Sequence, residues 1–230
     1  MVAAEALVRW NHPEHGLTMP ERFIHVAEET GLIAPIGEWV LRSACHQVRS
    51  WREAGLKIDL SVNLSSRQIK RGLSSDTLAA ILKETGISAP FLTLEITEGL
   101  LLEETEQTIS WLHAVKDLGV HLSVVAVASK KTTLGYLKRF PVDVIKIDRS
   151  FIRDVITDPS DASWVDAIIA IGRSLKLKVV AEGVETAEQL QFVRNHGCDL
   201  VQGHFFSEPI PARSFRRFME QNSIAAFWSA

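Results

Sequence analysis

The sequence predicts an α/β fold in which helices cover a parallel sheet, and three observations lead to that prediction. Short apolar runs alternate with amphipathic stretches along nearly the whole chain. The apolar runs are almost continuous, which is typical of strands buried on both faces. Glycines follow the helical patterns just before new strands, where helices commonly end. This order of elements is compatible with an open doubly wound sheet and with a (β/α)8 barrel.

The elements follow one another at short intervals. The expected strands, all rich in Val, Ile and Leu, are residues 58–64, 91–96, 121–128, 142–147, 178–181 and 199–201. Residues 6–10 are expected to end a further strand that has no partner before it. Apolar residues recur every three or four positions within 36–51, 109–118 and 167–175, which predicts three helices that face a core.

Composition and charge narrow the class of protein. The chain has 230 residues with 25 basic and 28 acidic side chains, and no basic run exceeds two residues, so neither DNA nor an anionic membrane is an expected partner. No apolar run reaches the roughly 18 residues of a membrane span, so membrane insertion by this segment is not expected. The two cysteines lie far apart and suggest no disulfide. We expect one domain over residues 1–230, cut from a longer cytoplasmic or membrane-attached protein and located in the cytoplasm.

Polar residues gather where the predicted strands end. They are Asn63, Glu95, Lys146, Asp148, Glu182 and Gln202. A barrel brings all its strand ends to one mouth, whereas an open sheet binds ligands at its switch point, so polar residues on at least five strands favour the barrel.

The same residues have a chemistry in common. The carboxylates of Glu5, Glu95 and Glu182 and the amide oxygen of Asn63 form an all-oxygen set that suits Mg²⁺ or Mn²⁺. Lys146 is expected to orient a water or to offset phosphate charge. A carboxylate at a strand end can instead cap the next helix, and for any one of these acids that alternative stays open.

Six segments, in this order, resemble the motifs of one family. They are Glu5-Ala6-Leu7-Val8-Arg9-Trp10, Ser61-Val62-Asn63-Leu64-Ser65, Leu94-Glu95-Ile96-Thr97-Glu98, Lys146-Ile147-Asp148-Arg149-Ser150-Phe151, Ala181-Glu182-Gly183-Val184-Glu185-Thr186 and Gln202-Gly203-His204-Phe205-Phe206-Ser207. The chain resembles the EAL domain family, the phosphodiesterases that hydrolyse cyclic di-GMP to linear pGpG. The resemblance implies a modified TIM (β/α)8 barrel of the EAL type with two metal ions at its carboxyl mouth.

The resemblance also assigns roles to residues. Glu5, Asn63 and Glu95 resemble ligands of the first metal, and Glu182 resembles a ligand of the second. Lys146 matches a lysine beside the nucleophilic water, and Glu185 a supporting acid, which makes these two the catalytic positions. The expected contacts with the dinucleotide are Leu7, Arg9, Asp148 and Gln202, and Glu98 matches a residue that steadies a loop.

The sequence departs from the family pattern in two places. The family has an Asp-Asp pair where this chain has Val125 and Ala126, and loop glycines where it has Ala128 and Lys130. No Asp or Glu occurs between Leu118 and Val142, so we expect at most one weakly bound Mg²⁺ or Mn²⁺ and a remodelled loop at 128–133. The family also has an opening strand before Glu5, and the barrel expected here lacks this first strand.

Three hypotheses follow. The first is a catalytically inactive EAL domain that acts as a regulatory module, binding cyclic di-GMP or a protein partner such as a second copy of itself. The second is an active Mg²⁺- or Mn²⁺-dependent cyclic di-GMP phosphodiesterase that compensates for the missing aspartates. The third is a protein-interaction scaffold without a nucleotide site.

Overall fold

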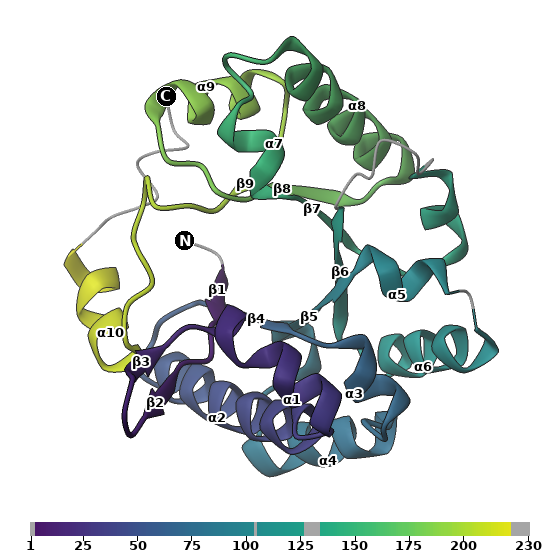
Figure 1. The fold of residues 1–230 in the computed structure, drawn as a ribbon, viewed down its shortest axis with the longest axis vertical. Coiled ribbons are helices and arrows are strands. Elements are labelled where there is room, and N and C mark those ends of the chain that lie inside the picture. The colour runs from purple at the N-terminus through teal and green to yellow at the C-terminus, as the bar shows by residue number, and fades with distance from the viewer. Residues whose placement is uncertain (1–2, 104, 127–133, 222–230) are drawn as a thin grey trace. The chain divides into compact units, whose positions relative to one another are not determined.

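A computed structural model describes residues 3–103, 105–126 and 134–221 of the chain (Figure 1). Its contacts divide the chain into two compact units. The first unit comprises Met1–Glu95, Glu106–Val120 and Ile210–Ala230, and the second comprises Ile96–Thr105 and His121–Pro209. Each unit is described by itself below.

The strands of the first unit are parallel. β1 (Ala3–Ala6) pairs with β4 (Asp59–Asn63), which pairs in turn with β5 (Leu92–Thr97), whose last two residues belong to the second unit. Ala6 lies opposite Val62, and Asn63 lies opposite Glu95, so the register brings the carboxyl ends of these strands together. A separate antiparallel hairpin joins β2 (Trp10–His12) and β3 (Gly16–Thr18).

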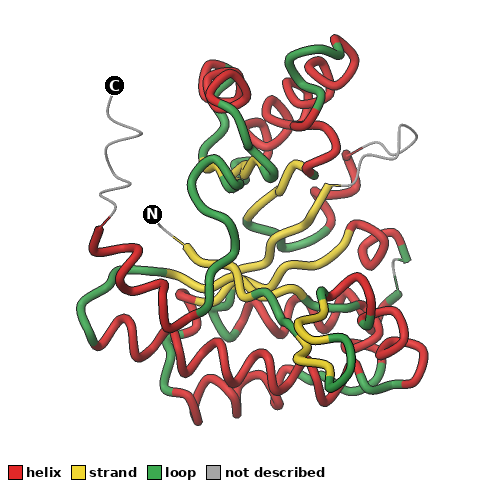
Figure 2. Tube along the Cα trace, turned by 60° about the vertical axis from the view of Figure 1, so that its left-hand side comes forward, coloured by secondary structure: helices red, strands yellow, loops and turns green. Residues whose placement is uncertain are grey.

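Helices of the first unit lie beside its strands, as the tube in Figure 2 also shows. They are η1 (Pro20–Arg22), α1 (Ile24–Thr30), α2 (Ile33–Glu53), α3 (Ser66–Lys70), α4 (Ser75–Thr85), η2 (Ala89–Phe91), α6 (Glu106–Asp117) and α10 (Ala212–Gln221). The predicted helix over 36–51 lies within α2, which packs on β4 and α4. Its buried face was only partly predicted: Val48 of the predicted stripe is buried, whereas Ile36, Val40, Ala44 and Trp51 are half-buried, and the other buried residues are Ile33, Leu41 and Cys45. Such burial contributes about 1.5–3 kcal/mol for each large apolar side chain.

The second unit has four parallel strands. They are β6 (His121–Ala126), β7 (Val144–Ile147), β8 (Lys178–Ala181) and β9 (Leu200–Val201), paired in that order. Its helices are α5 (Glu98–Leu102), η3 (Leu134–Arg139), α7 (Arg149–Arg153), α8 (Pro159–Leu175) and α9 (Ala187–Asn195). α8 packs on β7 and β8 (Figure 1), and it contains the whole of the apolar stripe predicted for 167–175, with Ile168 fully buried.

Two aspartates fasten the amino ends of these strands. Asp143, just before β7, accepts a hydrogen bond from the Leu122 amide of β6 at 2.8 Å. Asp199, just before β9, accepts one from the Val179 amide of β8 at the same distance. Each aspartate therefore joins the start of its own strand to the preceding strand, which fixes the register at the end opposite to the polar strand ends.

The strand predictions agree with the structure to within about two residues, with two qualifications. The strand expected at 6–10 was misplaced, because the chain pairs with β4 only over Ala3–Ala6 and then leaves the sheet. Residues 127 and 128, which were expected to extend the third strand, lie outside the described residues. No helix among the described residues is long and apolar enough to cross a membrane.

Candidate metal and ligand site

Three oxygen-bearing side chains meet at the carboxyl end of the strands of the first unit. Glu5 is on β1, Asn63 ends β4 and Glu95 is on β5. A carboxylate oxygen of Glu5 and one of Glu95 lie within 4.8 Å of each other. The Asn63 amide donates a 2.5 Å hydrogen bond from Nδ2 to Glu5 Oε1. We call these three residues the oxygen cluster.

Backbone pairing positions the cluster. Asn63 and Glu95 are direct partners in the β4–β5 register. The next residue, Leu64, donates its amide to the Glu95 carbonyl at 2.8 Å, so the pairing continues past the end of β4. Glu95 is only 4% exposed, whereas Asn63 is exposed. The cluster is therefore anchored at its inner side and accessible at its outer side.

The donor chemistry of the cluster fits a hard divalent cation. Mg²⁺ and Mn²⁺ prefer carboxylate and amide oxygens, and the cluster provides both kinds. Because Asn63 donates its amide nitrogen to Glu5, its amide oxygen is the atom that could serve as a ligand of a cation. The side chains of Glu5, Asn63 and Glu95 can thus hold one ion between three strands of a single unit.

The second unit places a lysine and a carboxylate together at its strand ends. Lys146, on β7, forms an ion pair through Nζ with Oε1 of Glu182, the residue that follows β8. Lys146 is 2% exposed, and the side chain of Glu182 is 21% exposed. A buried charge of this kind needs a close counter-charge, since removing one member of a buried pair costs about 3–5 kcal/mol.

The end of β6 bears hydrocarbon side chains. Val125 lies opposite Lys146 in the β6–β7 register, and Ala126 lies opposite Ile147. These two residues stand where the resemblance predicts the Asp-Asp pair. Among the described residues of the second unit, Glu182 is then the one carboxylate that was predicted as a metal ligand, and it is paired with Lys146. This donor set does not fit a second divalent cation.

The other predicted residues of the second unit have more local roles. Asp148 caps α7, since its Oδ1 accepts a 2.8 Å hydrogen bond from the Ser150 amide. The Gln202 backbone bridges two strand ends, with its amide on the Ala181 carbonyl and its carbonyl on the Val184 amide. Glu185 is exposed, and its Oε1 lies 3.9 Å from His204 Nδ1.

Leu7 and Arg9, the two predicted ligand contacts near β1, lie in the loop after that strand. Leu7 is 41% exposed. The Arg9 guanidinium donates a 2.9 Å hydrogen bond to the carbonyl of its neighbour Val8.

Sequence reasoning missed the two glutamines that hold the strand-end loops. Gln68 and Gln189 are 3% and 7% exposed, and each completes a capping box, with Ser65 and Thr186 respectively. Gln189 also accepts the Glu185 amide at 2.7 Å and donates to the Arg153 carbonyl at 3.2 Å. The spacing Ser/Thr-x-x-Gln was a readable signal for both boxes.

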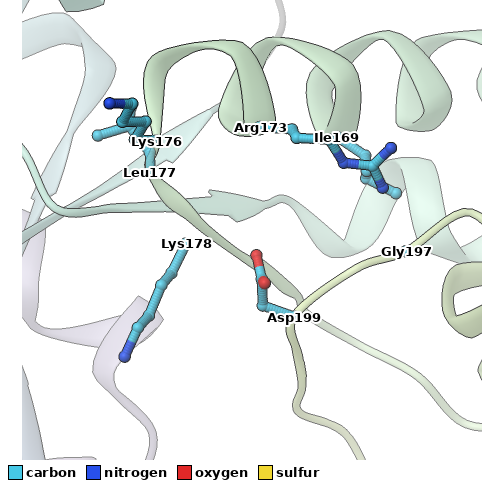
Figure 3. A pocket seen from close by; sticks show the side chains of 7 residues that line it. All are labelled: Ile169, Arg173, Lys176, Leu177, Lys178, Gly197 and Asp199. Atoms are coloured by element: carbon cyan, nitrogen blue, oxygen red, sulfur yellow. The ribbon is translucent and has the colours of Figure 1, made fainter.

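A cavity of about 280 Å³ also lies in the second unit, near the amino end of β8. It is lined by Ile169, Arg173, Lys176, Leu177, Lys178, Gly197 and Asp199 (Figure 3). Lys176 and Lys178 point away from each other in Figure 3, and Asp199 already accepts the Val179 amide. None of these lining residues is a predicted site residue, and the basic side chains do not converge on one point.

Comparison with known proteins identifies the family. The EAL domain family model matches residues 1–209. The chain is 44% identical over 216 residues to the cyclic di-GMP phosphodiesterase NbdA of Pseudomonas aeruginosa, covering 94% of this chain and 28% of NbdA. It is 38% identical to the cyclic di-GMP phosphodiesterase PdeR of Escherichia coli over 217 residues, covering 94% of this chain and 33% of PdeR. The chain thus spans about a third of the length of these relatives.

Solved structures agree with this assignment. The structure of the PaMucR phosphodiesterase in complex with c-di-GMP matches with a TM-score of 0.89 at 40% identity, over 94% of this chain and 87% of that one. The EAL enzyme Bd1971, with cAMP and cyclic-di-GMP bound, also gives 0.89, at 28% identity, over 95% of this chain and 60% of that one. The predicted α/β fold of the EAL type is therefore confirmed, and the chain belongs to the EAL domain family.

Proposed function

We propose that this chain is an EAL domain that binds cyclic di-GMP through a single cation site and does not hydrolyse it. The oxygen cluster is the cation site, and a Mg²⁺ or Mn²⁺ bound there would neutralise charge on a phosphate of the ligand. The relatives named as cyclic di-GMP phosphodiesterases and the c-di-GMP complex of PaMucR support this choice of ligand.

One observation carries the loss of hydrolysis. Hydrolysis by a metal pair needs two ions about 3.5–4 Å apart, one to activate the attacking oxygen and one to stabilise the leaving oxygen. In the second unit, Val125 and Ala126 offer no oxygen ligand, and the Glu182 carboxylate is paired with Lys146. The Lys146 ammonium provides fixed positive charge for a phosphate oxygen, but it cannot lower the pKa of a bound water as a metal does. The site therefore favours binding over turnover.

The remaining ligand residues follow from the family resemblance. Arg9 contacts a phosphate, and Leu7, Asp148 and Gln202 line the dinucleotide. Glu185 supports the strand-end loop that follows Glu182. In this role the domain is a regulatory module. A protein partner or a second copy of the chain would distinguish its cyclic di-GMP-bound state from its free state.

An active phosphodiesterase is the second candidate. The 44% identity to NbdA, which is named as a cyclic di-GMP phosphodiesterase, is the observation that favours it. A carboxylate from another part of a longer protein, or a phosphate oxygen of the ligand itself, would then have to complete the second metal site. The two candidates differ in one product, linear pGpG.

Calorimetry and product analysis separate the candidates. The chain is titrated with cyclic di-GMP in Mn²⁺ and in EDTA, and the mixtures are then resolved by chromatography. We expect binding that weakens in EDTA and no linear pGpG. Formation of pGpG that is abolished by Glu5→Ala would establish the active enzyme and overturn the proposal, and no heat under any condition would leave an interaction scaffold.

A gain-of-function pair sharpens this test. Val125→Asp/Ala126→Asp restores the two carboxylates and is expected to restore pGpG formation. Val125→Asn/Ala126→Asn is the matched control, because it has the same shape without negative charge and is expected to stay inactive. Activity in both variants, or in neither, would show that the hydrocarbon end of β6 is not what blocks hydrolysis.

A further inference from the structure

Several hydrogen bonds hold the turn that follows Asn63 at the end of β4. The Leu64 amide is bound by the Glu95 carbonyl at 2.8 Å, and the Ser65 amide by Gln68 Oε1 at 2.9 Å. The Ser65 hydroxyl oxygen accepts the Arg67 amide at 3.2 Å as the N-cap of α3. Since the backbone on both sides of Asn63 is fixed, the direction of the Asn63 side chain depends on this turn.

A carboxylate on a different helix completes the turn. Ser65 donates its hydroxyl hydrogen to Oε1 of Glu28 at 2.5 Å. This distance is typical of a hydrogen bond to an ionised carboxylate, which is about twice as strong as a neutral one. Glu28 is half-buried on α1, which is 37 residues away in sequence and is not one of the sheet strands.

We propose that Glu28 is a positioning residue for the oxygen cluster, acting through Ser65 to orient Asn63 toward the cation. The inference rests on the proposed cation site in the first unit. Removing a group that orients a metal ligand without touching the metal typically lowers metal affinity by about 10–100-fold. Glu28 has this relation to Asn63, because it binds Ser65 in the turn that follows the ligand residue.

The test measures Mn²⁺ affinity directly, without turnover. Titrations followed by electron paramagnetic resonance of free Mn²⁺ compare the wild-type chain with Glu28→Ala, Glu28→Gln and Glu29→Ala. We expect about 10-fold weaker binding for Glu28→Ala. Glu28→Gln keeps an oxygen that accepts from Ser65 and is expected to stay within about threefold. Glu29 is the exposed next residue of the same helix, so Glu29→Ala removes the same charge and is expected to bind like the wild type.

A double variant tests whether Glu28 acts through Ser65. If it does, Glu28→Ala/Ser65→Ala binds Mn²⁺ no more weakly than Ser65→Ala alone, because the second change removes a contact that is already lost. Additive losses would contradict the route through Ser65. Thermal unfolding of each variant is recorded, and the Asn63 side-chain amide is followed by NMR in metal-free samples, where Glu28→Ala should shift its signal and Glu29→Ala should not.

The outcomes separate the inference from the function on which it rests. If the wild-type chain binds no Mn²⁺, the cation site of the proposed function is wrong, and the positioning role falls with it. If the wild type binds Mn²⁺ and Glu28→Ala binds equally well with an unchanged Asn63 signal, the cation site stands and the inference alone is overturned.

Discussion

The two units fix their strand ends by different means. In the first unit, side chains hold the turn after β4: Gln68 caps the turn and its amide lies against α2, where a Cβ on Gly37 would come within 1.5 Å of Gln68 Nε2. In the second unit, the loops after β8 and β9 pack backbone to backbone. A Cβ on Gly203 would lie 2.0 Å from the Val184 carbonyl oxygen. The contact between Gln68 and Gly37 in the first unit is flexible, because a side chain makes it. The contact between Gly203 and Val184 in the second unit is rigid, because backbone makes it.

The two units also differ in charge at the strand ends. The first gathers the oxygen ligands of Glu5, Asn63 and Glu95, whereas the second pairs the Glu182 carboxylate with Lys146. The strand ends of the first unit thus carry the oxygen ligands of the proposed cation site, and those of the second unit carry a buried ammonium paired with a carboxylate.

The largest expected effect comes from the rigid contact. Gly203→Ala places a methyl group against the Val184 backbone, which cannot move aside as a side chain can, and we expect a loss of about 3 kcal/mol in the free energy of unfolding. Urea unfolding measures it. Gly99→Ala is the control in the same unit, because Gly99 is an exposed position of helix α5 and the nearest atom to the new Cβ would be 4.0 Å away. A loss below about 1 kcal/mol for Gly203→Ala would contradict backbone packing.

The next effect is a loss of stability at high pH, which we expect from the one buried thiol in each unit. Burial raises the pKa of Cys45 and of Cys198 from 9.0 to about 11, with a hydrogen bond from Thr85 acting in the opposite direction at Cys45. Because the folded state keeps these protons longer than the unfolded state, their stabilisation is complete below pH 9 and is lost as the pH rises toward 11. The loss is about 1 kcal/mol for each thiol by about pH 10.

Urea unfolding between about pH 8 and 10.5 measures this loss against the variants Cys45→Ala and Cys198→Ala. Each variant should show a shallower fall in stability over that range, even if it is less stable at neutral pH. An unchanged pH dependence in either variant would show that its thiol ionises as easily in the folded state as in the unfolded state.

The smallest expected effect is that of Gly37→Ala on the free energy of unfolding, and its sign depends on whether Gln68 is present. Gly→Ala within a helix normally stabilises by about 0.5–1 kcal/mol. At Gly37 the new methyl group would displace the Gln68 amide from its capping box, so we expect Gly37→Ala to destabilise slightly. In a Gln68→Ala background the obstacle is gone, and the same change should stabilise by about 0.5 kcal/mol. Equal effects in both backgrounds would mean that Gln68 does not lie against α2.

Much of the fold was predictable because strand and helix signals are local. The apolar runs identified β4, β5, β7 and β8, and residues at the predicted strand ends such as Asn63 and Glu95 do meet. Pairing between parallel strands depends on register, which a single sequence does not specify. The Lys146–Glu182 pair was therefore not foreseen, although both residues had been selected individually.

Other features depend on contacts distant in sequence. Nothing near Glu28 indicates that its carboxylate binds Ser65, since the two are brought together by α1 folding against the turn after β4. The helix-capping role of Asp148 was not predicted, and it is shown by the hydrogen bond from the Ser150 amide. Local patterns thus identify candidate site residues, and tertiary contacts assign their roles.

The number of Mn²⁺ ions bound at saturation tests the central claim most directly. Equilibrium dialysis against Mn²⁺ with saturating cyclic di-GMP, followed by elemental analysis, gives the ions bound per chain. The account predicts one, which is lost in Glu5→Ala, and two in Val125→Asp/Ala126→Asp. Two tightly bound ions in the unaltered chain would contradict it.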